Sequence, residues 1–324
     1  MFAHAENSTP APTTAINTPA AGPVLVACDG AAHSNDALYR AARVAAAALG
    51  TSIEILGVCE PITGVAGTMD LLPAPASLDE SRRQNMLRDL QRSVSIAASG
   101  DPSWPSAVIL GSPPRTLARE AAARDASLIV MGIGRHNPLD RLFGTETTLA
   151  TLRESRVPVL AVGNNFPTAP INAVAGIDFS RSSIRAAKTA IQMLSNGGRL
   201  TLVHVRPQFE HPSSDWQEWD TEYSRTLPPL FEQITKELQA PTGIRVDTVT
   251  VRGDPAPALL AYAQQVNADL IAVGTQRHSL YERLVVGSVA TRVLRTARCG
   301  VLAVPQNDVV CPNGQPQPSQ NQQQ

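Results

Sequence analysis

The chain has 324 residues, 43% of them hydrophobic, which is enough for about two domains that each bury a core. Its 27 Lys and Arg against 28 Asp and Glu leave a formal net charge of −1, so the balance argues against a dedicated nucleic-acid binder. No apolar run is long enough to cross a bilayer, and we expect no membrane partner.

The cysteines and the ends of the chain bear on its compartment. Cys28, Cys59, Cys299 and Cys311 lie far apart without a CxxC pair, which predicts reduced thiols and a cytoplasmic location rather than a disulfide framework or zinc site. The N-terminal residues show neither the basic nor the apolar segment of a secretory signal. Segments 1–22 and 306–324, rich in Pro with Ala and Thr or with Gln, are predicted to be disordered tails.

From residue 23 onward, short apolar runs alternate with segments of helical periodicity. The runs predict strands at Val24–Cys28, Ser52–Glu60, Ser106–Gly111, Ser127–Gly132 and Val157–Gly163, and the segments predict helices at Asp36–Leu49, Leu78–Ala98 and Pro114–Arg124. Because the runs are continuously apolar, the predicted sheet is covered by helices on both faces. Strands that alternate with helices indicate right-handed βαβ units and a parallel sheet.

The second half repeats this order. Its predicted strands are Ala173–Asp178, Leu200–Val205, Thr248–Gly253, Asp269–Gly274 and Gly300–Pro305. The alignment of Gly111 with Gly253 also aligns Gly132 with Gly274, at one constant offset. Such repetition predicts an α/β fold of two tandem doubly wound domains with mainly parallel five-stranded sheets. We place the first domain at 23–163, a linker rich in Asn and Pro at 164–170, and the second domain at 171–305.

Ligands of doubly wound sheets bind beyond the carboxyl ends of the strands, where the strand order reverses. Asp29 and Asp178 follow the first strand of each copy, where a carboxylate can accept hydrogen bonds from a base or sugar. Capping of the next helix is the commoner role of an Asp at such a position. Gly132 and Gly274 follow the fourth strands and permit close approach of a ligand. Further on, a Gly-Thr or Gly-Ser pair precedes a predicted helix, whose N-terminus favours phosphate.

The segment Val273–Pro305 resembles the C-terminal signature of the universal stress protein family. Nucleotide-binding members of that family carry Gly, two residues, Gly, nine residues, then Gly-Ser or Gly-Thr. The Asp after the first strand, His204–Val205 and Gly253–Leu260 extend the resemblance over nearly all of 23–305, in two copies. Family members dimerise through their last strand, so the resemblance implies that Val157–Val162 and Gly300–Pro305 pair within this chain. A homodimer of the whole chain stays open.

Carried over position by position, the resemblance implies a site for an adenine nucleotide, ATP with Mg²⁺. Its adenine and ribose contacts would fall on Asp178, Val205, Gly253 and Gly274, and its phosphate contacts on Gly287, Ser288 and Val289. The matching positions of the first copy are Asp29, Val58, Gly111, Gly132, Gly144, Thr145 and Glu146.

The chain departs from the family motif at its middle glycine, which is Arg277 in the second copy and Arg135 in the first. Arg277 could clamp the phosphates, fill the site or point to solvent, and the sequence leaves these three alternatives open. The first copy has one residue fewer before Gly144, and Glu146 stands where the second copy has Val289. Because a negative charge there should weaken phosphate binding, we predict a working site in the second copy and a degenerate one in the first.

Several other residues have plainer interpretations. We expect His204 to be a hydrogen-bonded packing residue and Cys28 and Cys59 to be buried thiols. Trp216 and Trp219 are assigned to an acidic polar loop. The repeated pairs Arg135–His136 and Arg277–His278 are expected to line a loop rather than to transfer protons.

The sequence thus predicts a cytoplasmic stress-response protein that works by binding or signalling and is not an enzyme, apart from slow incidental ATP hydrolysis. One alternative is a nucleotide-free scaffold whose two sites are closed by Arg135 and Arg277. A second is an enzyme that transfers phosphoryl or adenylyl groups, but no metal-binding carboxylate pair is found near the phosphate positions, and no Walker A motif occurs.

Overall fold

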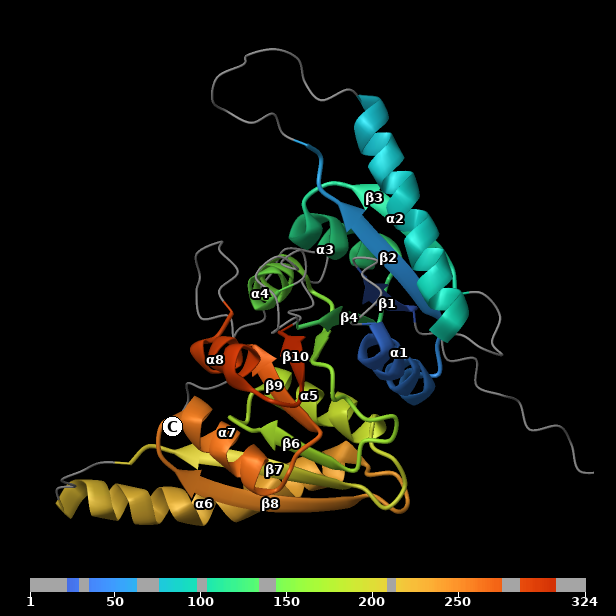
Figure 1. The fold of residues 1–324 in the computed structure, drawn as a ribbon. Coiled ribbons are helices and arrows are strands. Elements are labelled where there is room, and N and C mark those ends of the chain that lie inside the picture. The colour runs from blue at the N-terminus through green and yellow to red at the C-terminus, as the bar shows by residue number, and fades with distance from the viewer. Residues whose placement is uncertain are drawn as a thin grey trace, which may run out of the picture.

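A computed structural model describes residues 22–28, 35–62, 76–97, 104–133, 144–208, 214–275 and 286–306. The predicted disordered tails therefore lie almost wholly outside the described residues. Within these ranges, strands and helices alternate along the whole chain (Figure 1).

The first half of the chain contains five strands. Their bounds, with those of the intervening helices, are β1 Val24–Ala27, α1 Asn35–Leu49, β2 Ile53–Cys59, α2 Ala76–Ala97, β3 Ser106–Leu110, α3 Pro113–Ala123, β4 Leu128–Gly132, α4 Thr145–Glu154 and β5 Val159–Val162. The strands agree with the apolar runs of the sequence to within two residues at each end.

The second half repeats the same order. Its elements are β6 Asn172–Gly176, α5 Arg181–Gln192, β7 Arg199–Arg206, α6 Ser214–Leu238, β8 Arg245–Arg252, α7 Pro255–Gln265, β9 Leu270–Thr275, α8 Ser288–Thr296 and β10 Gly300–Pro305. The assignment of Trp216 and Trp219 to a loop is wrong, because both lie in α6. They share one helix face with Tyr223, at a spacing of three and four residues that the polar neighbours concealed.

All ten strands form one sheet in the order β3-β2-β1-β4-β5-β10-β9-β6-β7-β8. Each half is parallel throughout, and each has the order of a doubly wound unit. The predicted α/β fold of two tandem doubly wound units is confirmed. The domain boundaries at 163 and 171 remain a prediction.

The two halves meet at β5 and β10, which pair antiparallel. Leu160 faces Leu302 in the register of this pair, and both are fully buried. The predicted pairing of the two last strands within the chain is therefore confirmed. It leaves neither strand as an exposed edge, and such edges promote association with other chains.

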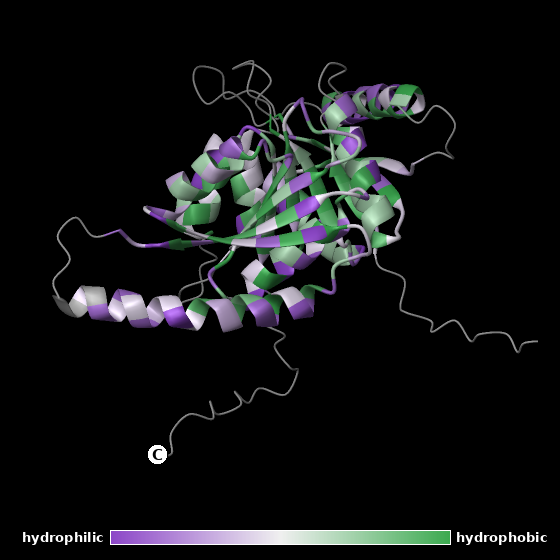
Figure 2. Cartoon of the chain, turned by 90° about the horizontal axis from the view of Figure 1, so that it is seen from below, coloured by the Kyte–Doolittle hydropathy of each residue, from purple (hydrophilic) through white to green (hydrophobic). Residues whose placement is uncertain are grey.

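Helices cover the sheet on both faces. The side chains of α1, α2, α5 and α6 form one apolar layer, and those of α3, α4, α7 and α8 form the other. Side chains alternate between the layers along each strand: Val24 and Val26 belong to the first layer, Leu25 and Ala27 to the second. Figure 2 shows the largely hydrophobic sheet and, below it, the long helix α6, one end of which extends past the strands.

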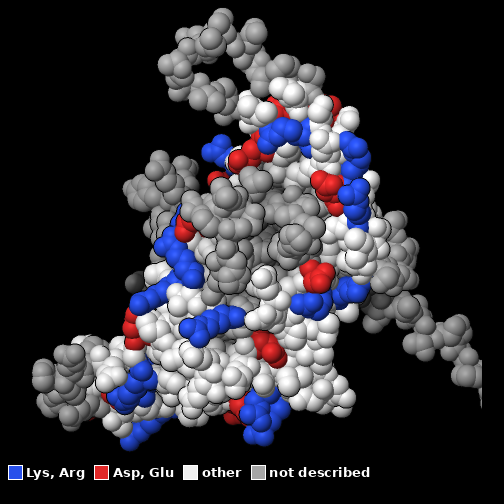
Figure 3. All heavy atoms as spheres, in the orientation of Figure 1, with Lys and Arg blue, Asp and Glu red and all other residues white. Residues whose placement is uncertain are grey.

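The surface carries charges of both signs. On the face in Figure 3, basic and acidic side chains are interspersed rather than gathered by sign. Many of the described ones form ion pairs, such as Arg292 with Asp254 at 2.9 Å. No helix in the described part of the chain combines the length and apolar character that a membrane span requires.

Candidate functional site

The carboxyl ends of β9, β6, β7 and β8 bring the four predicted adenine and ribose positions to one edge of the sheet. Gly176 pairs with Val203 on one side and with Val273 on the other, which puts Asp178, Val205 and Gly274 within about one residue of the same level. Gly253 follows β8, and its N–H donates to the carbonyl of Arg206 at 2.9 Å. The strand order reverses between β9 and β6, so this edge is the crevice expected to hold a ligand.

Asp178 lies in the tight turn between β6 and α5. Its Oδ1 accepts a hydrogen bond from the Ser180 N–H at 3.0 Å, and the residue is exposed. Ser180, not Asp178, is the N-cap of α5, since its Oγ accepts from the Ser183 N–H. The sequence left Asp178 either a capping or a ligand role, and the structure gives the cap to Ser180.

The next residue, Phe179, adopts the left-handed region with φ +63°, which is unusual for a side chain of this size. Its ring packs against His204 and Phe231, with centroids 4.8 and 5.6 Å away. These ring contacts hold the backbone in this conformation. The turn that presents Asp178 is thus fixed from the α6 side of the sheet.

Gly274 has a packing reason to be glycine. A Cβ there would lie 2.5 Å from both Ser182 Oγ and the Ser183 nitrogen, because β9 ends against the buried start of α5. For Gly132, the matching position, no described atom lies within 4 Å of such a Cβ. The predicted reason for both glycines, close approach of a ligand, was the same, and the sequence alone could not tell the two positions apart.

The predicted phosphate contacts lie at the start of α8. Gly287 is the N-cap and makes no side-chain cap hydrogen bond. An α-helix leaves its first N–H groups without partners inside the helix, and they favour an anion. One turn further on, the Arg292–Asp254 ion pair joins α8 to the residue directly after Gly253. Val289 and Val205 pack against the same apolar layer.

The first domain has the same framework but a different helix start. Ser155 and Ala297 end α4 and α8 alike, each donating its N–H to a helix carbonyl four residues back at 2.8 Å. Counted from these ends, α4 begins one residue earlier than α8, and Glu146 matches Ser288 rather than Val289. The buried faces of α4 and α8 keep the same offset in the sequence. Because the first copy has one residue fewer before Gly144, α4 therefore begins one residue earlier.

Glu146 also has a partner. Its Oε1 accepts from Arg295 Nε and Nη2 at 3.1 and 2.8 Å, and this ion pair joins α4 to α8 across the two domains. Both side chains are more than half exposed, so the pair contributes at most about 1 kcal/mol. By the same count, Arg295 matches Arg153 and Glu146 matches Ser288. Because a serine cannot form an ion pair with an arginine, this pair between the domains has no counterpart.

Other predicted positions of the first domain sit as expected for its sheet. Val58 pairs with Ile109, Gly111 donates its N–H to the Cys59 carbonyl at 3.0 Å, and Gly132 pairs with Val162. Gly144 is the N-cap of α4, and Thr145 is its first residue. Asp29, Arg135, His136, Arg277 and His278 lie outside the described residues, so the role of Arg277 stays a prediction.

Sequence reasoning missed a polar cluster beside this edge. Arg206, at the end of β7, is buried; it forms an ion pair with Asp220 of α6 and donates to Ser224 Oγ at 2.7 Å. Asp220 also binds Arg252 at the end of β8, at 2.6 Å. Burial lowers the pKa of the Arg206 guanidinium, and the nearby charge of Arg252 lowers it further. The helical spacing of Trp216, Trp219 and Tyr223 was the one signal that could have placed α6 over these strand ends.

His204 joins the same cluster. Its Nδ1 lies 2.7 Å from the Ile177 carbonyl, and its Nε2 lies 2.9 Å from the Tyr223 hydroxyl. Because a carbonyl only accepts, Nδ1 carries a proton, and the Nε2 of a neutral imidazole then accepts from Tyr223. The prediction of a hydrogen-bonded packing histidine is confirmed. Cys28 and Cys59 are buried thiols, as predicted.

Over the described ranges, no group of three or more His, Cys, Asp or Glu side chains is placed to hold a metal ion. Asp178, the backbone at Val205 and Gly253, and the Ser288 hydroxyl offer oxygen and N–H groups. Such groups fit a sugar, a base and phosphates, while Mg²⁺ commonly takes much of its coordination from substrate phosphates and water.

Comparisons with known proteins bear on both halves. The model of the universal stress protein family matches residues 21–163 and 172–305. Universal stress protein MJ0531 of Methanocaldococcus jannaschii is 30% identical over 131 residues, which cover 39% of this chain and 77% of that protein. A putative universal stress protein of Staphylococcus aureus (strain USA300) is 29% identical over 139 residues, 41% of this chain and 82% of that protein.

Solved structures resemble the whole two-domain arrangement. A universal stress protein from Archaeoglobus fulgidus matches with a TM-score of 0.57 and 18% identity, over 89% of this chain and 97% of that chain. PA1789 from Pseudomonas aeruginosa, described as functionally unknown, matches with a TM-score of 0.58 and 17% identity, over 88% and 93%. At these identities the likeness concerns the fold.

Proposed function

Because the chain belongs to the universal stress protein family, we propose that this stress-response protein acts in the cytoplasm by binding an adenine nucleotide in its second domain. The observation that carries the proposal is the convergence of Asp178, Val205, Gly253 and Gly274 at the crevice beyond β9 and β6. These four positions are far apart in the sequence, and they match the family's adenine and ribose contacts.

Each group has a distinct role in this proposal. The exposed Asp178 carboxylate accepts hydrogen bonds from the ribose hydroxyls or the adenine amino group. Backbone groups at Val205 and Gly253 contact the base, and glycine at 253, with φ +138°, gives the chain its turn there. The first N–H groups of α8 and the Ser288 hydroxyl bind the phosphates, with Val289 beside them. Bound ATP would bring Mg²⁺ on its phosphates.

The two domains differ in this role. Glu146 replaces Ser288 in the first turn of the helix that would meet the phosphates, so the first domain offers a carboxylate where the second offers a hydroxyl donor. Even when paired with Arg295, an exposed carboxylate remains an acceptor and disfavours an anion beside it. The proposal assigns no catalytic residue, and any hydrolysis of ATP would be slow and incidental.

The test is to follow the backbone amide signals of the isotope-labelled full chain by NMR while Mg-ATP is added. We expect saturable shifts at Val205, Gly253, Gly274 and Ser288. The signals of the first-domain counterparts Val58, Gly111, Gly132 and Glu146 serve as the internal control and should not shift. Equal shifts in both sets would contradict the assignment to one domain, and no shifts would favour the scaffold with closed sites.

A further inference from the structure

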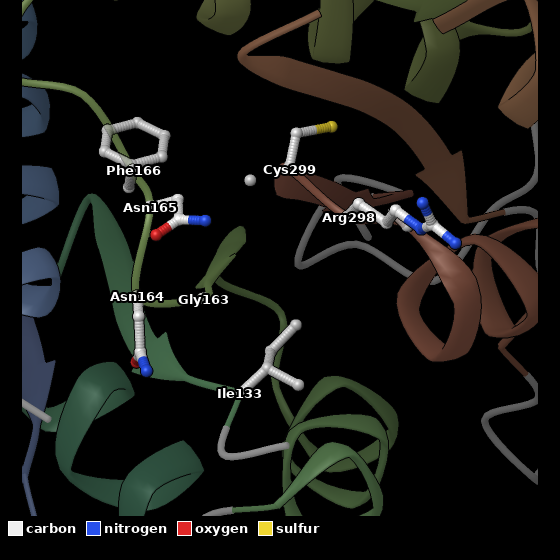
Figure 4. A pocket seen from close by; sticks show the side chains of 9 residues that line it. Ile133, Gly163, Asn164, Asn165, Phe166, Arg298 and Cys299 are labelled. Atoms are coloured by element: carbon white, nitrogen blue, oxygen red, sulfur yellow. The ribbon is translucent and has the colours of Figure 1, made fainter. Parts of the chain in front are cut away.

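A pocket of ≈ 380 Å³ lies where the two domains join, apart from the proposed nucleotide site (Figure 4). It forms because β5 and β10 are antiparallel, which puts the end of β5 next to the start of β10. Its lining comes from both halves of the chain: Ile133, Gly163, Asn164, Asn165 and Phe166 from one, Ala297, Arg298, Cys299 and Gly300 from the other. Pockets of this size at domain junctions are common ligand sites.

The walls of this junction pocket are held in place. Arg40 of α1 donates from Nε to the Phe166 carbonyl at 2.9 Å and from Nη2 to the Asn164 carbonyl at 3.2 Å. Phe166 is buried against Gly300, where a Cβ would come within 2.7 Å of the ring. The pocket is thus preformed, which lowers the entropy cost of filling it.

The lining has a consistent chemistry. Ile133, Phe166 and Ala297 are apolar, and no Asp or Glu is among the nine lining residues. Figure 4 shows the Asn165 carboxamide turned toward the open centre, while the Arg298 side chain begins on the opposite side and extends away from the centre. In the part of the chain that the structure describes, neither the Asn165 side chain nor the Arg298 guanidinium has a hydrogen-bond or ion-pair partner.

We propose that the junction pocket binds a small organic carboxylate with an apolar body. The apolar body packs on Ile133 and the Phe166 ring, and the carboxylate accepts hydrogen bonds from Asn165 and Arg298. Arg298 is exposed, so rotation of its side chain brings the guanidinium over the opening at little cost. A guanidinium prefers a carboxylate to a neutral amide because its hydrogen bonds are then charge-assisted.

The chain supplies a matched control through its internal repeat. Arg156 follows the end of α4 as Arg298 follows the end of α8, and it is likewise exposed. It does not line the junction pocket, and Pro158 stands at the position that matches Gly300. Arg156→Gln therefore removes the same charge from the same kind of turn without touching the pocket.

The probe is sodium benzoate, with benzamide as its neutral isostere and sodium chloride as the control for ionic strength. Added to the isotope-labelled full chain, benzoate should shift the amide signals of Gly163, Cys299 and Gly300 in a saturable way, while benzamide binds at least about tenfold more weakly. Arg298→Gln and Asn165→Leu should each weaken benzoate binding, Arg298→Gln by about tenfold or more, and Arg156→Gln should leave it unchanged.

Three results would overturn the proposal: no saturable shift at these amides, equal binding of benzoate and benzamide, or equal weakening by Arg298→Gln and Arg156→Gln. The substitutions are at exposed positions, and their unfolding midpoints serve as the check that the chain still folds. The amides that report here differ from those that report on Mg-ATP, so failure of one proposal is distinguishable from failure of the other.

Discussion

Gly287→Asp should weaken Mg-ATP binding by at least about 100-fold, whereas Gly144→Asp should change it less than about twofold. An Asp at the N-cap of α8 places its carboxylate on the N–H groups that the phosphates would use. The carboxylate competes for these donors and also repels the phosphates, at an energetic cost of about 3–4 kcal/mol for charges some 4–5 Å apart near a protein surface.

This pair of variants separates loss of binding from loss of folding. Asp is a better N-cap than Gly, so both variants should be at least as stable as the parent chain in urea unfolding. Gly144 and Gly287 are both N-caps without a side-chain cap bond, so the local change is the same in the two domains. Calorimetric titration gives the two affinities. A loss of similar size in the two variants would contradict the asymmetry between the domains.

Asp220→Ala should lower the free energy of unfolding by about 2–4 kcal/mol, the largest stability effect that we expect of a single surface-accessible carboxylate here. Asp220 pairs with Arg206, whose side chain is 7% exposed, and with Arg252. Its removal leaves a buried guanidinium facing a second cation, and the Nε of that guanidinium has no hydrogen-bond partner among the described residues. Breaking such a pair costs more than the pair itself contributes, because the remaining charge stays out of water.

Asp254→Ala is the matched control. Asp254 also pairs with one arginine, Arg292, but both side chains are about 60% exposed, and Asp254 makes no cap hydrogen bond with its side chain. Its loss should cost less than about 1 kcal/mol. Urea unfolding measures the loss of stability in both variants from the shift of the midpoint, provided that the slope m stays the same. Equal destabilisation by the two substitutions would show that the Arg206 cluster does not hold α6 to the strand ends.

The fold was predictable because its signals are local and repeated. Continuous apolar runs, helical segments between them and one constant offset from Gly111–Gly253 to Leu160–Leu302 are all visible in the sequence. The pairing of β5 with β10 followed from the family resemblance rather than from the residues alone. The loop assignment of Trp216 and Trp219 failed because polar neighbours outweighed a helical spacing that spans only a few residues.

The residues of the candidate site could be proposed from the sequence, but their contacts could not. Gly274 must be a glycine because Ser182 lies against it in the folded chain. Glu146 forms an ion pair with Arg295 of the other domain. The Arg206–Asp220 pair joins a strand to a helix through burial that no pattern in either segment reports. Long-range contacts of this kind depend on the packed structure. The sequence therefore named Gly274 and Glu146 without their partners and did not reveal the Arg206–Asp220 pair at all.

Titration calorimetry of the full-length protein with Mg-ATP tests most directly whether one domain binds an adenine nucleotide. The account predicts saturable heat with a stoichiometry near one nucleotide per chain. Two equivalent sites would contradict the asymmetry, and no heat at two temperatures, with no shift of the unfolding midpoint by nucleotide, would contradict nucleotide binding itself.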